Sequence, residues 1–427
     1  MDLDDLDPER FAAALREMIE RHEMLRCVVL PEGLQRILPS APDYKVEVSD
    51  FRHLDAASAQ AGIAAIRAEM AHKAFTPDQW PLFEFRISRL DERRSRLHVS
   101  MDLLIVDGRS FEILFDELMA VYREPGTALP VLDLSFRDYI AALDSLEKTK
   151  AFEDSRKYWL ERVSTLPPSP ELPLTKNPAA VQQAVLERRS ARLDAGTWRG
   201  LKENCNRFHC TPAGILLAAY AEVLAIWSKN PRFTINLTLF NRLPLHPQSN
   251  DILGEFTSVA LLEVDNATAG TFAERARLKR EQLWRDLDRR YFSGIEVMRE
   301  LTRMQRVGPK AIMPVIFTSL LNLDESGGTG SWAFRLGKPA YGIVQTPQVY
   351  LELIVQEDNG ALVIDWDAIE ELFPEGLLDD MLAGFQRLLH DLAGGQESWH
   401  RTLAENTWRL IPEAQLEMRR QVNATQA

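Results

Sequence analysis

The chain has 427 residues, of which 45% are hydrophobic and 26% charged, and its 50 basic and 63 acidic side chains give a formal net charge of −13. This length exceeds what one ordinary hydrophobic core accommodates, so the sequence predicts two lobes. The negative charge disfavours nucleic acid as a partner, because phosphate binding requires a basic surface. The negative net charge does not exclude acidic protein partners that dock on a local basic patch.

Neither a membrane nor an oxidising compartment is indicated. No apolar run approaches the length that crosses a bilayer, and the acidic N-terminus lacks the features of a secretion signal. The three cysteines, Cys27, Cys205 and Cys210, are too few for a disulfide framework and are not spaced as metal ligands. We therefore expect a cytoplasmic chain without a bound metal.

The N-terminal part of the chain predicts a helix, a hairpin and a second helix. Asp7 is a suitable N-cap, Pro8 suits the first helical position, and apolar residues then recur at helical spacing. Alternation predicts two strands, over 83–90 and 97–106, with a charged turn between them. The second helix is expected from about Ser110 to Tyr122.

A proline-rich stretch, residues 166–174, cannot form a helix interior or a central strand, and it is the best candidate for a boundary. Beyond it, the pattern predicts a helix over 212–227, strands over 233–240 and 315–320, a hairpin over 349–366 and a helix over 377–390. The hairpin turns at Asn359-Gly360, a pair typical of tight turns. Strands and helices that alternate in two halves predict an α/β or α+β fold with two lobes.

A candidate site lies where the predicted strand over 97–106 ends. Asp102, Asp107 and Ser110 place two carboxylates and a hydroxyl there. From spacing alone the favoured interpretation is an ordinary turn, in which Ser110 serves as the N-cap of the next helix.

The same three residues fit the pattern Asp-x-x-x-x-Asp-x-x-Ser, and through it the chain resembles the heterocyclization variant of the condensation domains of non-ribosomal peptide synthetases. Plain condensation domains carry His-His-x-x-x-Asp-Gly here, and Leu103 stands where their second histidine acts on the incoming amine. Other stretches resemble the family in its order along the chain: 166–174, 211–228, 236–244, 254–258, 317–319 and 345–349.

This resemblance implies two chloramphenicol acetyltransferase-like lobes that form a V around a central tunnel. The expected ranges are 1–165 for the N-terminal lobe, 166–180 for a linker, 181–412 for the C-terminal lobe and 413–427 for an exit linker toward an adenylation domain. Carrier proteins would present the substrates on phosphopantetheine arms, and no cofactor would be bound.

The implied activity has two parts. An acyl thioester is joined to the amine of a cysteine, serine or threonine thioester. The side chain then closes onto the new amide and expels water, which leaves a thiazoline or an oxazoline ring, as in the biosynthesis of siderophores and other secondary metabolites.

The resemblance also assigns roles to individual residues. Asp107 and Arg242 would form a structural ion pair between the lobes. Thr318 and Glu352 would catalyse the loss of water. Residues expected to line the substrate tunnel are Asp102, Ser110 and Gln345.

The chain departs from the family pattern at three side chains. Glu352 and Glu255 stand where the family has aspartate, and Tyr350 stands where it has tryptophan. The extra methylene of Glu352 displaces its oxygens, and a displacement of about 1 Å can cost on the order of a hundredfold in rate. Condensation without ring closure is therefore an alternative.

The chain also starts late relative to the family. We expect it to lack the strand that precedes the helix at Pro8, which would leave a sheet edge unpaired. A non-catalytic remnant or docking domain is accordingly a second alternative.

Overall fold

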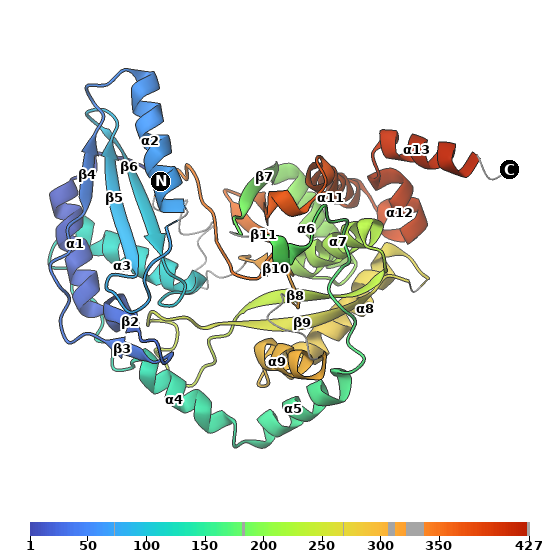
Figure 1. The fold of residues 1–427 in the computed structure, drawn as a ribbon, viewed down its shortest axis with the longest axis horizontal. Coiled ribbons are helices and arrows are strands. Elements are labelled where there is room, and N and C mark those ends of the chain that lie inside the picture. Colours follow the sequence, from blue (N-terminus) through green and yellow to red (C-terminus); the bar gives the residue numbers. More distant parts are fainter. Residues whose placement is uncertain (72, 182–183, 268, 306–311, 322–336, 425–427) are drawn as a thin grey trace. The chain divides into compact units, whose positions relative to one another are not determined.

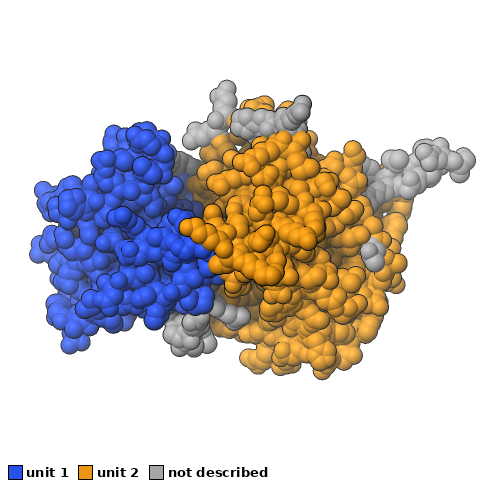
Figure 2. All heavy atoms as spheres, turned by 90° about the horizontal axis from the view of Figure 1, so that it is seen from below, with its two compact units in different colours: residues 1–146, 240–257, 330–343 blue, residues 147–239, 258–329, 344–427 orange. Residues whose placement is uncertain are grey.

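The structure is a computed structural model that describes the chain apart from residues 72, 182–183, 268, 306–311, 322–336 and 425–427. The chain forms two compact units, which Figure 2 colours separately. The first comprises residues 1–146, 240–257 and 330–343, and the second comprises 147–239, 258–329 and 344–427. This division differs from the expected lobes, because residues 147–165 pack in the second unit and 240–257 pack in the first.

In the first unit, the described residues form a sheet with the order β1-β6-β5-β4 (Figure 1). Its strands are β1 (Asp2–Asp4), β4 (Glu47–Asp50), β5 (Phe83–Arg89) and β6 (Arg94–Met101), and a separate ladder joins β2 (Cys27–Val29) to β3 (Gln35–Ile37). The expected hairpin is present as the antiparallel pair β5–β6. However, β6 ends at Met101 rather than at Val106. Asp102 bends the chain there, because its carboxylate accepts a hydrogen bond from the backbone N–H of Leu104 at 3.0 Å.

The expectation that no strand precedes the first helix is wrong. Residues Asp2–Asp4 form β1, antiparallel to β6, with Asp2 opposite Arg96. The Arg96 guanidinium donates to both carboxylate oxygens of Asp2, at 2.6 and 2.9 Å, and Leu3 is buried. A strand of three residues, two of them acidic, offers no hydrophobic alternation from which it could be predicted.

The helices of the first unit cover a core that the sequence pattern anticipates. They are α1 (Pro8–Arg21), α2 (Ala56–Ala71), α3 (Gly108–Arg123) and α4 (Phe136–Leu146). Helix α1 begins as predicted, since the Asp7 side chain accepts from the N–H groups of Glu9 and Arg10. Its buried residues Phe11 and Leu15 belong to the same core as Phe85 of β5 and Leu114 of α3.

The second unit contains a sheet with the order β7-β12-β11-β10-β8-β9. Its strands are β7 (Glu187–Leu193), β8 (Arg232–Phe240), β9 (Thr257–Asp265), β10 (Val315–Ser319), β11 (Leu351–Asp358) and β12 (Ala361–Ala368). Strand β10 runs parallel to both β8 and β11, which places it between them. The hairpin β11–β12 turns at Asn359 and Gly360 as predicted, and both residues have positive φ, 47° and 76°.

Helices pack against this sheet. The described helices of the second unit are α5 (Lys150–Arg162), α6 (Ala195–Arg207), α7 (Pro212–Trp227), α8 (Phe272–Leu287), α9 (Gly294–Gln305), α11 (Leu377–Gly394), α12 (Leu403–Leu410) and α13 (Glu413–Ala424). Trp366 of β12 contacts Tyr220 of α7 and Phe385 of α11, with ring centroids 5.8 and 6.3 Å apart. Among the described helices none is long and apolar enough by itself to cross a membrane; α6 and α7 pass this test only as a pair bent by 98°.

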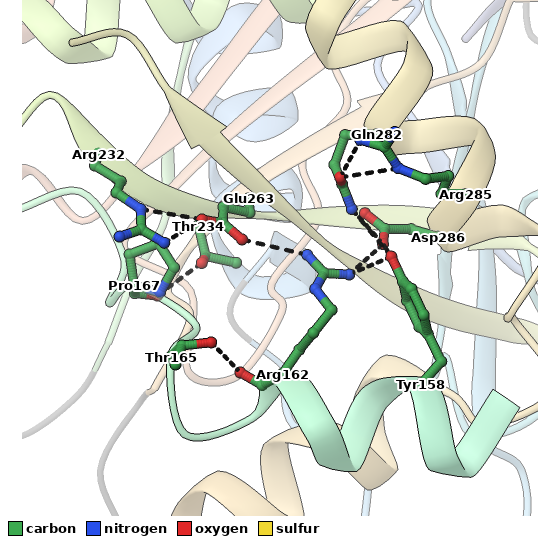
Figure 3. A network of polar contacts seen from close by, with 10 residues as sticks. All are labelled: Tyr158, Arg162, Thr165, Pro167, Arg232, Thr234, Glu263, Gln282, Arg285 and Asp286. Carbon is green, nitrogen blue, oxygen red and sulfur yellow. Dashed lines mark hydrogen bonds and ion pairs between the residues drawn. The ribbon is translucent and has the colours of Figure 1, made fainter. Parts of the chain in front are cut away.

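The proline-rich stretch is attached to the second unit. Thr234 of β8 donates its hydroxyl to the carbonyl of Pro167 at 2.7 Å and its N–H to that of Pro168 at 2.8 Å. Just before the stretch, Arg162 of α5 donates to Asp286 of α8 at 2.6 Å, and Figure 3 shows this network. The stretch is therefore held along β8 on its way to β7.

Residues 240–257 connect β8 to β9 and are held in the first unit by Arg242. Its Nη1 donates to the carbonyls of Ser249 and Ile252, at 3.0 and 2.8 Å. Its Nη2 and Nε donate to the two carboxylate oxygens of Asp107, at 2.7 and 3.2 Å. The side chains of Asp107 and Arg242 are 0% and 4% exposed. One guanidinium thus organises its own loop and joins it to the start of α3.

Loss of one member of this pair would leave the other charge buried without compensation. We expect Arg242→Met to lower the free energy of opening of α3 by about 3–5 kcal/mol, measured by native-state hydrogen exchange of the α3 amides. Arg93→Met, which removes an exposed ion pair with Asp5, is the control and should cost less than about 1 kcal/mol. Equal effects of the two variants would contradict a supporting role for Asp107.

Candidate active site

The cluster around Asp107 is closed by its own hydrogen bonds. Asp107, rather than Ser110, is the N-cap of α3, because its Oδ1 accepts from the backbone N–H and the hydroxyl of Ser110, both at 2.7 Å. A carboxylate at this position also meets the positive end of the helix dipole. The hydroxyl oxygen of Ser110 lies 2.9 Å from the Gly254 carbonyl and accepts from Arg242 Nη2 at 2.9 Å. Since these groups are saturated, the cluster is suited to support rather than to proton transfer.

Asp102 does not join this cluster. It follows β6, its backbone N–H donates to the Leu82 carbonyl, and its carboxylate caps the turn at Leu104. Within the described residues, no hydrogen bond connects Asp102 to Asp107 or Ser110. The next two residues, Leu103 and Leu104, are each 38% exposed.

Glu255, near the same cluster, is held in a different state. Its pKa is raised to about 7, chiefly by burial. The hydrogen bond from Thr257 opposes this shift, and the charge of the nearby Asp107 adds to it. The backbone N–H of Thr257 donates to Glu255 Oε1 at 2.6 Å. The first unit therefore contains one carboxyl that is bonded by an arginine, that of Asp107, and one whose pKa is about 7, that of Glu255.

In the second unit the structure brings Thr318 and Glu352 together. Strands β10 and β11 are parallel, with Ile316 opposite Glu352 and Thr318 opposite Ile354. Side chains two residues apart point to the same face of a strand, so Thr318 and Glu352 are diagonal neighbours. The Thr318 hydroxyl donates to Glu352 Oε1 at 2.6 Å. The hydroxyl of Thr238 on β8 lies 2.7 Å from that of Thr318 and must be the donor, because the Thr318 proton is already used.

The Glu352 carboxyl is buried and only half satisfied. The residue is 6% exposed, and its Oε2 has no hydrogen-bond partner among the described residues. The pKa of Glu352 is raised to about 7, chiefly by burial. The hydrogen bond from Thr318 and the charge of Arg188 oppose this shift, and the charge of Asp367 adds to it. Both the acid and its carboxylate are therefore populated near neutral pH, and the second oxygen of the group, which is also buried, is left without a partner among the described residues.

The diagonal arrangement bears on the replacement of aspartate by glutamate. Glu352 has to reach across to β10 and along it by two residues to meet Thr318. The extra methylene supplies this reach on the backbone that is present. In this chain the longer side chain completes the contact with Thr318.

Several polar neighbours of Glu352 were not singled out from the sequence. Asp367 lies directly opposite Glu352 on β12, and Arg188 lies opposite Asp367 on β7. On β8, Asn236 is buried with an Oδ1 that lacks a partner among the described residues. An acidic residue inside an apolar strand, as in the segment Ile364-Asp-Trp-Asp, is a signal that could have pointed to them.

Gln345 is used for support. Its side-chain amide accepts from the N–H of Leu186 at 3.0 Å and donates to the Leu186 carbonyl at 3.1 Å. These two bonds fasten the segment before β11 to the residue that precedes β7. The amide therefore reproduces a backbone-like pairing at this edge.

Comparisons with known proteins relate this site to a family. The family model described as the condensation domain matches residues 4–405. The chain is 38% identical over 403 residues to pyochelin synthetase PchF of Pseudomonas aeruginosa (strain UCBPP-PA14) and 35% identical over 398 residues to phenyloxazoline synthase MbtB of Mycobacterium sp. (strain MCS). Each match covers 92% of this chain, but the chain spans only 22% and 33% of the length of those proteins.

Solved structures agree with this relation. The cyclization-docking bidomain of the synthetase EpoB from Sorangium cellulosum is 39% identical with a TM-score of 0.85, over 93% of this chain and 80% of that one. The non-ribosomal peptide synthetase FmoA3 is 30% identical with a TM-score of 0.82, over 94% of this chain and 41% of that one. The fold is thus the mixed α/β fold of the EpoB cyclization domain. The chain belongs to the condensation-domain family of non-ribosomal peptide synthetases, a family of enzymes in which its homologues include cyclization domains.

Proposed function

We propose that this chain joins a carrier-bound acyl thioester to the amine of a carrier-bound cysteine, serine or threonine, and then closes the side chain into a thiazoline or oxazoline ring. The observation that carries the proposal is the buried, half-satisfied Glu352 carboxyl bonded to Thr318. The relatives support it, since one is a phenyloxazoline synthase and one solved structure is the cyclization-docking bidomain of EpoB.

The first step requires little acid–base chemistry from the chain. The substrate amine attacks the acyl carbon, the C–N bond forms, and the donor thiol leaves with a proton. Leu103 stands where a condensation histidine would be, and its side chain cannot accept or donate a proton. Positioning of the two thioesters would therefore contribute most of the acceleration.

The second step requires proton transfers that Glu352 can perform. The thiol or hydroxyl of the acceptor attacks the new amide carbon as its proton passes to the Glu352 carboxylate. The resulting acid returns a proton to the oxygen on that carbon. The proton of the nitrogen then passes through the Glu352 carboxyl to this hydroxyl, so that the C–O bond breaks, water leaves and the C=N bond forms. A group with a pKa of about 7 suits both directions of transfer.

The hydroxyls of Thr318 and Thr238 would orient the carboxyl. They form a one-way chain of donors that ends on Glu352 Oε1. Oε1 would thereby be fixed as the acceptor, which leaves Oε2, without a partner among the described residues, to exchange a proton with a bound substrate. The saturated pair of Asp107 and Arg242 would support the first unit without taking part in proton transfer.

The proposal extends to the surroundings of the domain. Carrier proteins would deliver the substrates on phosphopantetheine arms into a tunnel between two acetyltransferase-like lobes, and an adenylation domain would load the acceptor. Asp102, Ser110 and Gln345 would shape that tunnel, without a bound cofactor, nucleic acid or membrane, in the cytoplasm. Condensation alone is the second candidate, and the glutamate at position 352 is the feature that favours it.

Replacement of the Glu352 carboxyl by an amide should separate amide formation from ring closure. We expect Glu352→Gln to leave amide formation within about threefold of the parent and to lower ring formation by about a hundredfold or more, because an amide cannot exchange the required proton. Mass spectrometry of carrier-bound products measures both, since ring closure removes one water. Glu357→Gln on the same strand, where the carboxylate bonds Trp198 and Lys202, is the control. Parental amounts of ring from Glu352→Gln would exclude this carboxyl from the reaction.

The length of the side chain gives an independent test. We expect Glu352→Asp to lower the ratio of ring to open-chain product by about tenfold or more, because the shorter side chain withdraws its oxygens from Thr318 by about one bond length. The same mass-spectrometric assay measures the ratio. A higher ratio for Glu352→Asp would show that the extra methylene impairs the parent.

The stability of the domain should report the Glu352 proton without any substrate. A carboxyl whose pKa rises from 4.5 to about 7 on folding holds its proton more tightly in the native state. Its contribution to stability is therefore largest below about pH 4.5 and falls as the pH rises to about 7, by up to roughly 3 kcal/mol. Glu352→Gln should remove this loss and be more stable than the parent at pH 8, as measured by urea unfolding. Parallel pH profiles of the two proteins would contradict the raised pKa.

A further inference from the structure

A row of charged side chains continues from Glu352 across the sheet. Asp367 lies opposite Glu352 in the antiparallel pair β11–β12, and Arg188 lies opposite Asp367 in the pair β12–β7. Residues directly opposite each other in antiparallel strands have neighbouring side chains on the same face. Glu352, Asp367 and Arg188 therefore form one line on the face that bears Thr318.

The hydrogen bonds of this row are concentrated on Arg188 and Asp367. Arg188 donates Nε and Nη2 to the two carboxylate oxygens of Asp367, at 2.7 and 2.6 Å, and Nη1 to Asp365 at 3.2 Å. Asp367 is fully buried. Glu352 receives no hydrogen bond from either member within the described residues. Two carboxylates around one guanidinium leave a net negative charge beside Glu352.

The other groups around Glu352 do not supply a competing charge. Thr318 on β10 is a neutral donor. Tyr220 on α7, whose ring contacts Phe317 and Trp366, stays protonated because burial raises its pKa well above 10. The Arg188–Asp367 pair and its neighbour Asp365 are thus the charged groups near Glu352 in the described chain.

We propose that Asp367 and Arg188 are positioning residues for the proposed ring closure, in which Asp367 holds the proton on Glu352 and Arg188 limits that effect. The inference rests on the proposed function of Glu352. A like charge nearby disfavours the carboxylate, and an opposite charge favours it. The pair therefore sets the balance between the acid that releases water and the carboxylate that accepts the thiol proton.

A purely structural ion pair makes a different prediction. Its loss would destabilise the sheet whichever partner is removed, with effects of one sign. An electrostatic pair predicts opposite effects on the Glu352 proton. Asp367→Asn removes the like charge and leaves Arg188 less compensated, which favours the carboxylate. Arg188→Gln removes the opposite charge and favours the acid.

The test is a pH titration of Glu352 in the full chain. The infrared band of its protonated carboxyl is identified as the band that Glu352→Gln abolishes. We expect its midpoint to move to lower pH in Asp367→Asn and to higher pH in Arg188→Gln, each by about one unit or more. Asp358→Asn, which breaks the similar pair with Arg192 on the same sheet, should leave the midpoint unchanged.

Ring formation measured against pH on the same variants separates this inference from the proposed function. Its inflection should follow the infrared midpoint, while amide formation keeps the parental profile. Opposite infrared shifts without any ring product would support the electrostatic coupling and contradict the proposed ring closure. Equal or absent shifts, with ring formation still lost in Glu352→Gln, would overturn the role of the pair alone. Each variant decides by the sign of its own shift, so one that fails to fold does not block the test.

Discussion

The register of β10 against β11 is the constraint on which the candidate site depends. The parallel ladder sets Thr318 opposite Ile354, so that Glu352 becomes its diagonal neighbour on the same face. A slip of one residue would turn Glu352 into the apolar layer that contacts α7 and α11. The register is fixed from the other face, where Leu353 and Val355 are fully buried and Trp366 packs on Tyr220. Hydrophobic packing on one face thus positions polar chemistry on the other.

Local patterns predicted the elements that carry these residues. The first helix begins at Pro8 behind the Asp7 cap, and the last hairpin turns at Asn359-Gly360. Both depend on backbone preferences that a few neighbouring residues express fully. The likeness to a family then assigned Thr318 and Glu352, which the fold brings within 2.6 Å.

Long-range partners could not be predicted in the same way. Strand β1 has three residues and is defined by its pairing with Arg96, more than ninety residues later. Ser110 has the side chain of a helix cap, yet Asp107 takes that place because Arg242 and the helix N-terminus both stabilise its charge. Arg188 meets Asp367 only through the strand order β7-β12. None of these contacts leaves a periodic pattern in the sequence.

The contrast between two buried carboxyls distinguishes support from chemistry. Asp107 bonds a guanidinium through both oxygens and caps a helix, so both of its oxygens are occupied by structural partners. Glu352 has one oxygen without a partner among the described residues and lies beside an arginine that is shared by two carboxylates, those of Asp365 and Asp367. Such an arrangement costs stability, because a buried polar group is left unsatisfied. Folding alone would favour an apolar residue there, so a carboxyl on this packed strand is in keeping with the role in ring closure that we propose for it.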